Sequence, residues 1–460
     1  MIKFLTAGNV DDGKSSLIGR LLYDSNSLFE DQIEEVKRST DESFGKELDF
    51  SLFLDGLISE RKQKITIDVA YRYFSYDNKK FIIADAPGHE EYTRNMAVAA
   101  GNSDVIVILI DASKKVKPQT LRHSYIANLF GIKKVIVAIN KMDLVEYSET
   151  IFEEIKVDYL KKTKDLSFAE VDFVPVSSIN GENIVKKSKN MDWYKEKTIM
   201  ELLNDEKNEE NSQDGEFRLL VQNVVKHDDK RLYQGSLSNG KINVGQEAAL
   251  YPSQKLAKIV RIIKAGKEVK TAVKGDSISF ELDQDVDLER GGVVAFENSE
   301  DLIFSDKLKA NLIWFNNKDF TKKDLLKNEF IVKISHNDAS ASIEKLNGVI
   351  DLADGGKRGV KDLLKLNQIA NIDLSLSKKI AFDKFTNNKL NGSFLLIDPV
   401  SNETVACGIV DRGVESENVD LNEENLEDFL QGVSKLIKKH FPDSKLDAGA
   451  FLSKFSSMSF

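Results

Sequence analysis

One segment constrains the fold more than any other part of the sequence: Gly8-Asn-Val-Asp-Asp-Gly-Lys-Ser15. It matches the pattern G-x-x-x-x-G-K-[ST] and stands between an apolar run at 2–7 and a helical run at 16–23. The two glycines let the backbone curl so that its amides point at phosphate oxygens. Lys14 can then reach the β- and γ-phosphates, and the Ser15 hydroxyl can bind Mg²⁺. The candidate nucleotide-binding residues of this loop are Gly8, Asn9, Val10, Asp11, Asp12, Gly13, Lys14, Ser15 and Ser16.

The first part of the chain, up to about residue 200, alternates between apolar runs of strand length and amphipathic helical stretches. This alternation is typical of a doubly wound α/β domain with a mostly parallel sheet. Each candidate strand ends in a polar loop, which is where α/β sheets bind their ligands. The candidate strands lie at 2–7, 81–85, 105–111, 134–140 and 172–177.

A second motif, Asp85-Ala-Pro-Gly88, follows the apolar run at 81–84, and His89 comes directly after it. The Asp85 carboxylate at a strand end is suited to the Mg²⁺ shell, and the Gly88 amide to sensing a γ-phosphate. His89 is placed to orient an attacking water. The residues expected to contact the nucleotide here are Asp85, Ala86, Pro87, Gly88 and His89.

Two further motifs predict which base is bound. Asn140-Lys-Met-Asp143 follows a strand, and the Asp143 carboxylate can accept hydrogen bonds from guanine N1–H and its 2-amino group. Adenine lacks those donors, so an unpaired Asp143 would disfavour ATP. Ser177-Ser-Ile179 follows another strand and fits a loop behind the guanine ring. We therefore expect GTP as the ligand, bound through Asn140, Lys141, Met142, Asp143, Ser177, Ser178 and Ile179.

Thr66, in Lys64-Ile-Thr-Ile-Asp68, is the candidate switch residue. Its hydroxyl would join Ser15 and Asp85 on Mg²⁺ while its amide meets the γ-phosphate, so the loop would order with GTP and release on hydrolysis. The expected catalytic set is Lys14, Thr66, Gly88 and His89. Negative charge at Asp11 and Asp12 beside phosphates requires compensation by a cation or by nearby donors, and a metal or potassium ion near Asp11 is one candidate.

Four boundaries divide the chain. The GTP-binding domain is predicted at 1–203, followed by a polar, acidic linker at 204–215. Short β-branched segments with glycine turns predict one β-barrel at 216–303 and a second at 304–413. In the tail at 414–460, apolar residues at helical spacing predict one amphipathic helix, which docks on the chain's own barrel or on a partner.

Composition limits the remaining options. With 460 residues the chain is long enough for several domains, and its apolar runs are far shorter than the roughly 20 residues of a membrane helix. A net charge of −10 argues against broad nucleic-acid binding. The single cysteine, Cys407, fits a reducing compartment, and no secretion signal is visible. We expect a cytoplasmic protein that binds neither membrane nor nucleic acid.

Several of these segments together resemble the translation-factor class of GTPases, through Asp85-Ala-Pro-Gly-His89, Ile65-Thr-Ile67 and the two following β-domains. Within that class the chain is more similar to the large, GTPase subunits of bacterial sulfate adenylyltransferases. The similarity is strongest in Ile65-Thr-Ile-Asp-Val-Ala-Tyr-Arg-Tyr-Phe74, Glu91-Tyr-Thr-Arg-Asn-Met96 and Val137-Ala-Ile-Asn-Lys-Met-Asp-Leu-Val-Glu-Tyr-Ser148. Lys64 stands where that family usually carries glycine, which would stiffen the switch loop.

The resemblance implies a partner and a reaction. A small catalytic subunit would bind ATP and sulfate and form adenosine 5'-phosphosulfate and pyrophosphate. That product is a mixed anhydride, so its formation is uphill, and GTP hydrolysis on this chain would drive it through contacts that depend on the nucleotide.

Two alternatives remain at this point. One is an elongation factor-like GTPase that delivers aminoacyl-tRNA. The other is a regulatory GTPase of an unrelated assembly, whose turnover would be indifferent to sulfate and ATP. The stretch Asp68-Val-Ala-Tyr-Arg-Tyr-Phe74 argues against the first of these.

Overall fold

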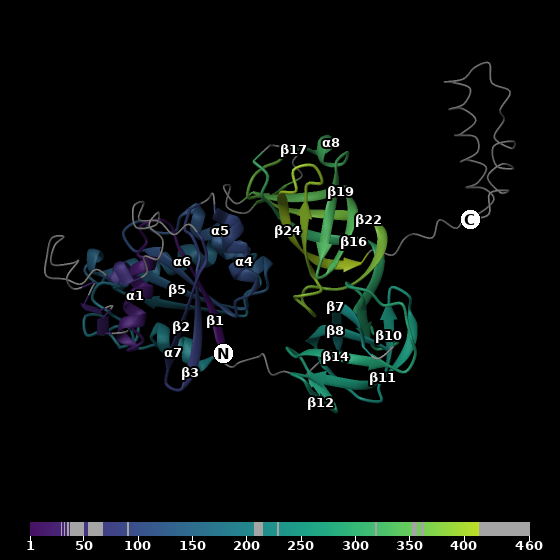
Figure 1. The fold of residues 1–460 in the computed structure, drawn as a ribbon. Coiled ribbons are helices and arrows are strands. Elements are labelled where there is room, and N and C mark those ends of the chain that lie inside the picture. The colour runs from purple at the N-terminus through teal and green to yellow at the C-terminus, as the bar shows by residue number, and fades with distance from the viewer. Residues whose placement is uncertain are drawn as a thin grey trace, which may run out of the picture. The chain divides into compact units, whose positions relative to one another are not determined.

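The computed structural model in Figure 1 describes residues 1–28, 30–31, 33–34, 36, 50–53, 68–89, 92–206, 215–227, 230–317, 320–351, 357–359 and 363–413. Thr66 and the predicted C-terminal helix lie outside these residues. Within the described part of the chain, no helix is both long enough and apolar enough to cross a bilayer.

The N-terminal part is built on a six-stranded sheet with the order β2-β3-β1-β4-β5-β6. Its strands pair in parallel, except for β2, which runs antiparallel to β3 at the edge. The central strands β4 and β5 are buried at every position, because helices cover both faces of the sheet and both sides of each strand must be apolar. The strands are β1 Ile2–Ala7, β2 Ala70–Tyr76, β3 Lys79–Asp85, β4 Val105–Asp111, β5 Lys134–Asn140 and β6 Glu170–Pro175.

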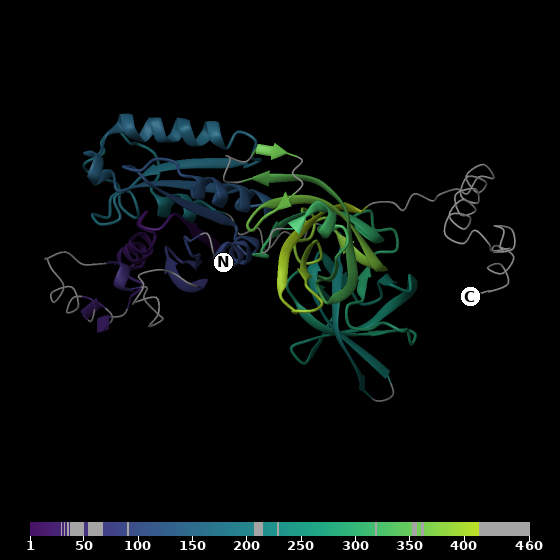
Figure 2. The same ribbon diagram turned by 90° about the horizontal axis from the view of Figure 1, so that it is seen from above.

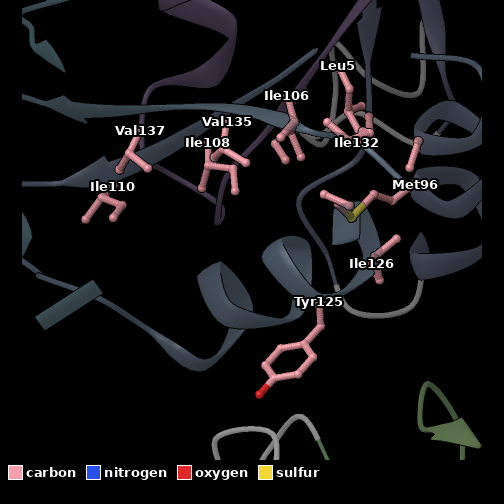
Figure 3. Close-up of a cluster of buried hydrophobic side chains, with 14 of the residues drawn as sticks. Leu5, Met96, Ile106, Ile108, Ile110, Tyr125, Ile126, Ile132, Val135 and Val137 are labelled. Carbon is pink, nitrogen blue, oxygen red and sulfur yellow. The ribbon is translucent and has the colours of Figure 1, made fainter. Parts of the chain in front are cut away.

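Helices cover the two faces of this sheet in separate groups (Figure 2). Helices α4, α5 and α6 pack on one face, where Met96, Ile126 and alternate residues of β4 such as Ile106 belong to one buried cluster (Figure 3). Helices α1 and α7 pack on the other face. The helices are α1 Lys14–Asp24, α4 Thr93–Gly101, α5 Pro118–Leu129, α6 Glu149–Lys162 and α7 Ile199–Asp205, with 3-10 turns η1 Phe50–Phe53 and η3 Met142–Val145.

Local signals start several of these helices. Pro118 occupies the first turn of α5, where its missing N–H leaves no hydrogen bond unmade. Thr198 caps α7 in a capping box with Glu201. That helix continues through Asp205, so Asn204 and Asp205 form its last turn and do not belong to the linker predicted from residue 204.

The first barrel closes through strand β10, which pairs with both β15 and β11. The order β10-β15-β7-β8-β14-β11 thus returns on itself, and β12 extends it beside β11. Its core is apolar, with Tyr233 stacked on Phe280. The strands are β7 Arg218–His227, β8 Lys230–Asn239, β9 Lys241–Asn243, β10 Glu247–Tyr251, β11 Lys255–Lys264, β12 Lys267–Val269, β13 Thr271–Val273, β14 Ser277–Leu282 and β15 Val293–Ala295.

The second barrel closes in the same way, because β18 pairs with both β23 and β19. Its ring order is β18-β23-β24-β16-β22-β19, and β20 extends it beside β19. Trp314 is fully buried in its core. The elements are β16 Leu302–Trp314, β17 Phe320–Thr321, α8 Lys322–Leu325, β18 Glu329–Ile334, β19 Asn337–Asp351, β20 Lys357–Gly359, β21 Leu363–Leu364, β22 Ile369–Asp383, β23 Ser393–Ile397 and β24 Thr404–Gly413.

The α/β domain and the two following barrels agree with the sequence-based prediction. Two details differ. Strand β16 begins at Leu302, so the predicted boundary between 303 and 304 falls inside a strand. Strand β6 ends at Pro175, two residues before the predicted end, because Ser177 turns into the next loop.

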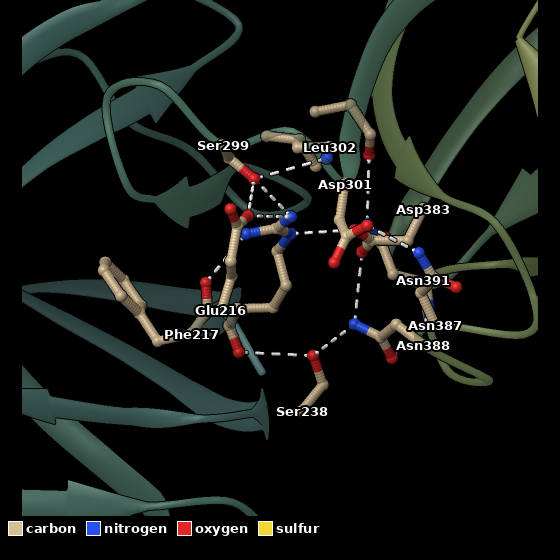
Figure 4. Close-up of polar contacts among 12 residues, drawn as sticks. Glu216, Phe217, Ser238, Ser299, Asp301, Leu302, Asp383, Asn387, Asn388 and Asn391 are labelled. Carbon is tan, nitrogen blue, oxygen red and sulfur yellow. Dashed lines mark hydrogen bonds and ion pairs between the residues drawn. The ribbon is translucent and has the colours of Figure 1, made fainter. Parts of the chain in front are cut away.

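A buried polar network joins the two barrels (Figure 4). Arg218 on β7 donates to the Asp383 carboxylate on β22 over 2.9 Å, and both side chains are 1% exposed. Arg218 also pairs with Glu216 at 3.2 Å, and Asp383 accepts hydrogen bonds from Asn388 and Asn391. Burial raises the pKa of Asp383, although Arg218 and the two asparagines oppose that rise. The first barrel is thus attached to the second by a desolvated ion pair.

We predict that Asp383→Ala lowers the free energy of unfolding of the barrels by about 3 kcal/mol or more, because Arg218 loses a buried partner. Asp383→Asn should cost less, because Glu216 still neutralises Arg218 and the raised pKa of Asp383 indicates that a neutral group is tolerated there. Urea denaturation measures both variants. The control is Glu268→Ala, which removes one of two carboxylates from the exposed Arg261 and should cost less than about 1 kcal/mol. Equal losses in Asp383→Ala and the control would contradict the prediction.

Candidate functional site

The predicted phosphate-binding loop connects β1 to α1 and borders a cavity of about 310 Å³. Gly13 caps α1 with a φ of 90°, in the left-handed region that favours glycine. Helix α1 thus begins beside the cavity, where its N-terminus would stabilise an anion. The residues lining the cavity are Asn9, Val10, Asp11, Gly13, Lys14, Ser15, Ser16, Gly88, His89 and Lys141.

Lys14 and Asp85 form an ion pair of 2.7 Å, and their side chains are 8% and 5% exposed. Lys14 also donates to the main-chain oxygen of Ala86. The sheet places the two groups together, because β1 and β3 are parallel neighbours with Thr6 opposite Asp85. Two residues that the sequence predicts for phosphate and for Mg²⁺ thus meet at one strand edge.

Asp12 is turned into the protein and does not line the cavity. Its carboxylate accepts hydrogen bonds from the Asn9 amide at 2.8 Å and from the Asn9 side chain at 3.0 Å. The ammonium of Lys117 lies 3.6 Å away. Protein donors therefore compensate the charge of Asp12, as the sequence requires. Asp11 is exposed at the cavity, and a cation beside it remains a prediction.

Asn140 ties the phosphate-binding loop to the predicted base-binding loops. Its side-chain amide donates to the Asp12 carbonyl at 2.8 Å, and its oxygen accepts from the Ser178 amide and hydroxyl at 3.0 and 2.9 Å. A Cβ at Gly13 would lie 2.3 Å from the Asn140 nitrogen, so only glycine fits that contact. Three loops that are far apart in the sequence are therefore held together by one amide.

Asp143 accepts a 2.6 Å hydrogen bond from the Ser177 hydroxyl, which orients the carboxylate predicted to bind guanine. Its neighbour Lys141 pairs at 2.9 Å with Asp111, the last residue of β4. Burial alone would raise the pKa of Asp111, but hydrogen bonds from Ser113 and Lys141 outweigh it and lower the pKa. Asp111 is thus a fixed anion that anchors Lys141 at the mouth of the cavity.

Gly88 packs directly against the phosphate-binding loop. A Cβ there would lie 2.6 Å from the Gly8 carbonyl oxygen, which no larger residue could accommodate without displacing the loop. His89 borders the cavity, and its ring lies edge-on to Tyr92 at 6.2 Å. The placement of Gly88 and His89 beside the loop is what a γ-phosphate sensor and a water-orienting group need.

Five other predicted nucleotide-binding residues lie away from the cavity lining. Gly8 supports the loop from beside Leu109, and Ala86, Pro87 and Met142 are buried as packing residues. Ile179 is 51% exposed, and its carbonyl accepts a hydrogen bond from Arg20 of α1 at 2.9 Å. None of these five side chains lines the cavity described above.

Sequence reasoning missed several supporting residues. Asp111 ends a predicted strand, so the rule that led to Asp85 and Asn140 would also have identified it. Lys117, Gln119 and Thr120 begin α5 and reach Asp12, Gly88 and Asn9, respectively. No motif marks them, because their roles depend on tertiary contacts.

Comparison with known proteins adds independent information. Residues 1–227 match the family described as elongation factor Tu GTP binding domain, and residues 307–411 match the family described as GTP-eEF1A C-terminal domain-like. The chain is 39% identical to sulfate adenylyltransferase subunit 1 of Cellvibrio japonicus over 445 residues, which cover 96% of this chain and 93% of that protein. The protein of the same name from Francisella tularensis subsp. novicida is also 39% identical, with the same shares covered. A solved structure of sup35 with GDP is 20% identical, covers 90% of this chain and 94% of its own, and has a TM-score of 0.41.

We predict that Asp143→Asn weakens GDP binding by about 30- to 150-fold, because one charge-assisted contact to guanine is lost, at about 2–3 kcal/mol. The same variant should gain affinity for XDP, because the new amide can donate to the 2-oxo group of xanthine. Calorimetric titration with both nucleotides measures the change. Asp165→Asn, the same substitution at an exposed position, is the control. Unchanged GDP affinity in Asp143→Asn would exclude this residue from base recognition.

Proposed function

Because the chain belongs to the sulfate adenylyltransferase subunit 1 family, we propose that it binds and hydrolyses GTP as one subunit of a sulfate-activating enzyme. One observation supports this most directly. Lys14, Gly88 and His89 border a single cavity, and Asp85 is paired to Lys14 beside it. The residues proposed for phosphate binding, γ-phosphate sensing and water orientation thus lie at one edge of the sheet.

Binding of GTP would exchange the partners of Lys14 and Asp85. The ammonium of Lys14 would move to the β- and γ-phosphates, and the carboxylate of Asp85 would turn to the metal shell. Both charges stay paired throughout, so neither is left buried and uncompensated, which would cost several kcal/mol. The buried pair thus keeps the site ordered before GTP enters it.

Ser15 and Asp85 present a hydroxyl and a carboxylate, the oxygen donors that Mg²⁺ prefers, and Ser15 lines the cavity. These donors fit the metal, and Thr66 would add a third oxygen. A bound Mg²⁺ would supply positive charge at this position, which would stabilise negative charge on the phosphates during transfer.

Hydrolysis itself would depend on Gly88 and His89. The Gly88 amide would contact the γ-phosphate, and His89 would hold a water in line with the bond that breaks. Phosphoryl transfer needs mainly positioning and charge stabilisation, which the Gly88 amide, His89 and the Lys14 ammonium would supply.

The second half of the proposal concerns energy coupling. A small partner subunit would bind ATP and sulfate in the cytoplasm and form adenosine 5'-phosphosulfate and pyrophosphate, and GTP hydrolysis on this chain would drive that uphill step. One contact supports a route out of the GTP site. Arg94 of α4, which follows the Gly88 loop, donates to the Thr404 carbonyl of β24 at 3.1 Å and lies 5.4 Å above the Phe315 ring. A movement of the Gly88 loop would therefore be transmitted through α4 and Arg94 to the second barrel.

An elongation factor-like role is the competing interpretation, and the match of residues 1–227 is compatible with it. The matched relatives named above favour sulfate activation, because they cover nearly the whole chain, barrels included. Binding of aminoacyl-tRNA by the GTP form would reverse this preference.

We predict that the chain, purified with its small partner subunit, releases pyrophosphate from ATP in a sulfate-dependent reaction that rises with GTP. Lys14→Ala should abolish the GTP stimulation, because the γ-phosphate loses its cation. A coupled pyrophosphate assay over many turnovers measures both. Release that is equally fast with a non-hydrolysable GTP analogue would defeat the energy-coupling proposal.

We also predict that His89→Ala lowers GTP turnover by about 100-fold or more and leaves GTP affinity within about twofold, because the side chain acts on water and not on the nucleotide. Single-turnover hydrolysis and equilibrium binding separate the two quantities. Turnover unchanged by this substitution would remove His89 from the mechanism.

A further inference from the structure

Gln119 contacts the Gly88 loop without lining the cavity. It is the second residue of α5, and its side-chain nitrogen donates to the Gly88 carbonyl at 3.2 Å. The same nitrogen lies 3.1 Å from His123 Nε2, and the side-chain oxygen accepts from Arg122 at 2.6 Å. Every polar atom of this side chain therefore has a partner.

These partners leave one arrangement of the amide. A carbonyl oxygen can only accept and a guanidinium can only donate, so the Gln119 nitrogen must face Gly88 and its oxygen must face Arg122. The second N–H then points at His123, whose Nε2 must be the acceptor. A neutral imidazole meets that need, and burial together with the charges of Lys14 and Arg122 lowers the pKa of His123 to about 3. The orientation of the Gln119 amide is thus determined from three sides.

The Gly88 carbonyl belongs to the peptide plane that links Gly88 to His89. A hydrogen bond to that oxygen limits rotation of the plane, and the plane determines where the His89 side chain starts. The next carbonyl, that of His89, accepts from the Tyr92 amide at 3.2 Å. Gly88 is also close to the phosphate-binding loop, since a Cβ there would lie 2.6 Å from the Gly8 carbonyl oxygen. His89 is therefore held through its backbone from both directions.

The start of α5 supports the phosphate-binding loop as well. Thr120 accepts a hydrogen bond from the Asn9 side chain at 3.3 Å, and Lys117 lies 3.6 Å from the Asp12 carboxylate. One helical turn thus contacts both walls of the cavity. The first turn of α5 therefore supports both the loop predicted to bind phosphate and the loop that bears His89.

We propose that Gln119 is a positioning residue for GTP hydrolysis: its amide fixes the Gly88–His89 peptide and so holds His89 in the orientation from which it acts on water. The inference rests on the proposed function. Gln119 itself does not line the cavity and does not touch the reacting atoms.

The test is Gln119→Glu, which keeps the size of the side chain and its contact with Arg122. The new carboxylate can only accept hydrogen bonds, so it cannot donate to the Gly88 carbonyl oxygen. The two negatively polarised groups would repel each other, and the Gly88–His89 peptide would lose this restraint. We expect the rate constant for single-turnover GTP hydrolysis to fall by about 10- to 100-fold with GTP and GDP affinities within about twofold, because catalysis depends steeply on placement. Gln119→Met removes the donor without adding charge and should show the same split.

Asn102→Asp is the matched control. Asn102 also donates from a side-chain amide to a main-chain carbonyl, that of Val98 at 3.2 Å, but at the exposed end of α4. It should hydrolyse GTP at the parent rate. A loss in the control equal to that in Gln119→Glu would assign the effect to the domain's charge or stability and overturn the inference.

A double-mutant cycle shows whether Gln119 acts through His89. In a His89→Ala background no histidine side chain is left to position. Adding Gln119→Met should therefore lower turnover by less than about threefold. An unchanged 10- to 100-fold loss in that background would overturn the positioning role, as would parent-like turnover of both single Gln119 variants. Different results would overturn the proposed function itself: the parent chain would show no GTP turnover, or His89→Ala would be fully active.

Discussion

The parallel register of four strands is the constraint on which the site depends. Thr6 of β1 lies opposite Asp85 of β3, and Asp111 of β4 lies opposite Asn140 of β5. Because parallel strands all end at the same edge, the residues that follow them converge without any local motif to bring them together. The apolar faces of β4 and β5 keep this register, since a shift of one residue would turn buried isoleucines and valines toward the wrong helices.

Charge pairing is the second common feature of that edge. Three aspartates that are almost fully buried, Asp12, Asp85 and Asp111, each lie within 4 Å of a lysine, namely Lys117, Lys14 and Lys141. Each pair joins two different loops, so the pairs fix loop positions as well as balance charge. Of the three lysines, Lys14 and Lys141 border the cavity. A highly charged ligand would therefore meet two lysines at the cavity whose positions are already held by buried aspartates.

Sequence reasoning predicted the parallel strands of the sheet well, because long apolar runs such as 105–111 leave few alternatives. The nucleotide-binding roles of the loops that follow these strands stay predictions. The family prediction is confirmed by the relatives at 39% identity. Strand β2 was not predicted, since Tyr71 and Tyr73 are 46% and 71% exposed and its pattern lacks a continuous apolar run. The boundary inside β16 was misplaced because that strand spans 13 residues without a turn signal. Gln119 could not be assigned a role from the sequence, because its contact with Gly88 exists only once α5 is placed against that loop. Thr66 and the cation beside Asp11 stay predictions.

Helix α5 connects the candidate GTP site to the second barrel. Its first turn supports Gly88 through Gln119, and at its other end Phe130 packs edge-on against Phe385 of the second barrel at 6.1 Å. Phe385 lies two residues beyond Asp383, which binds Arg218 of the first barrel. Helix α5 thus links the Gly88 loop to the second barrel, Asp383 links that barrel to the first, and Arg94 adds a contact from α4 to β24. Helices and closed barrels are stiff, whereas the Gly88 loop is held by single hydrogen bonds. A change of nucleotide would therefore be absorbed at that loop or at the contacts between domains, and not within the barrels.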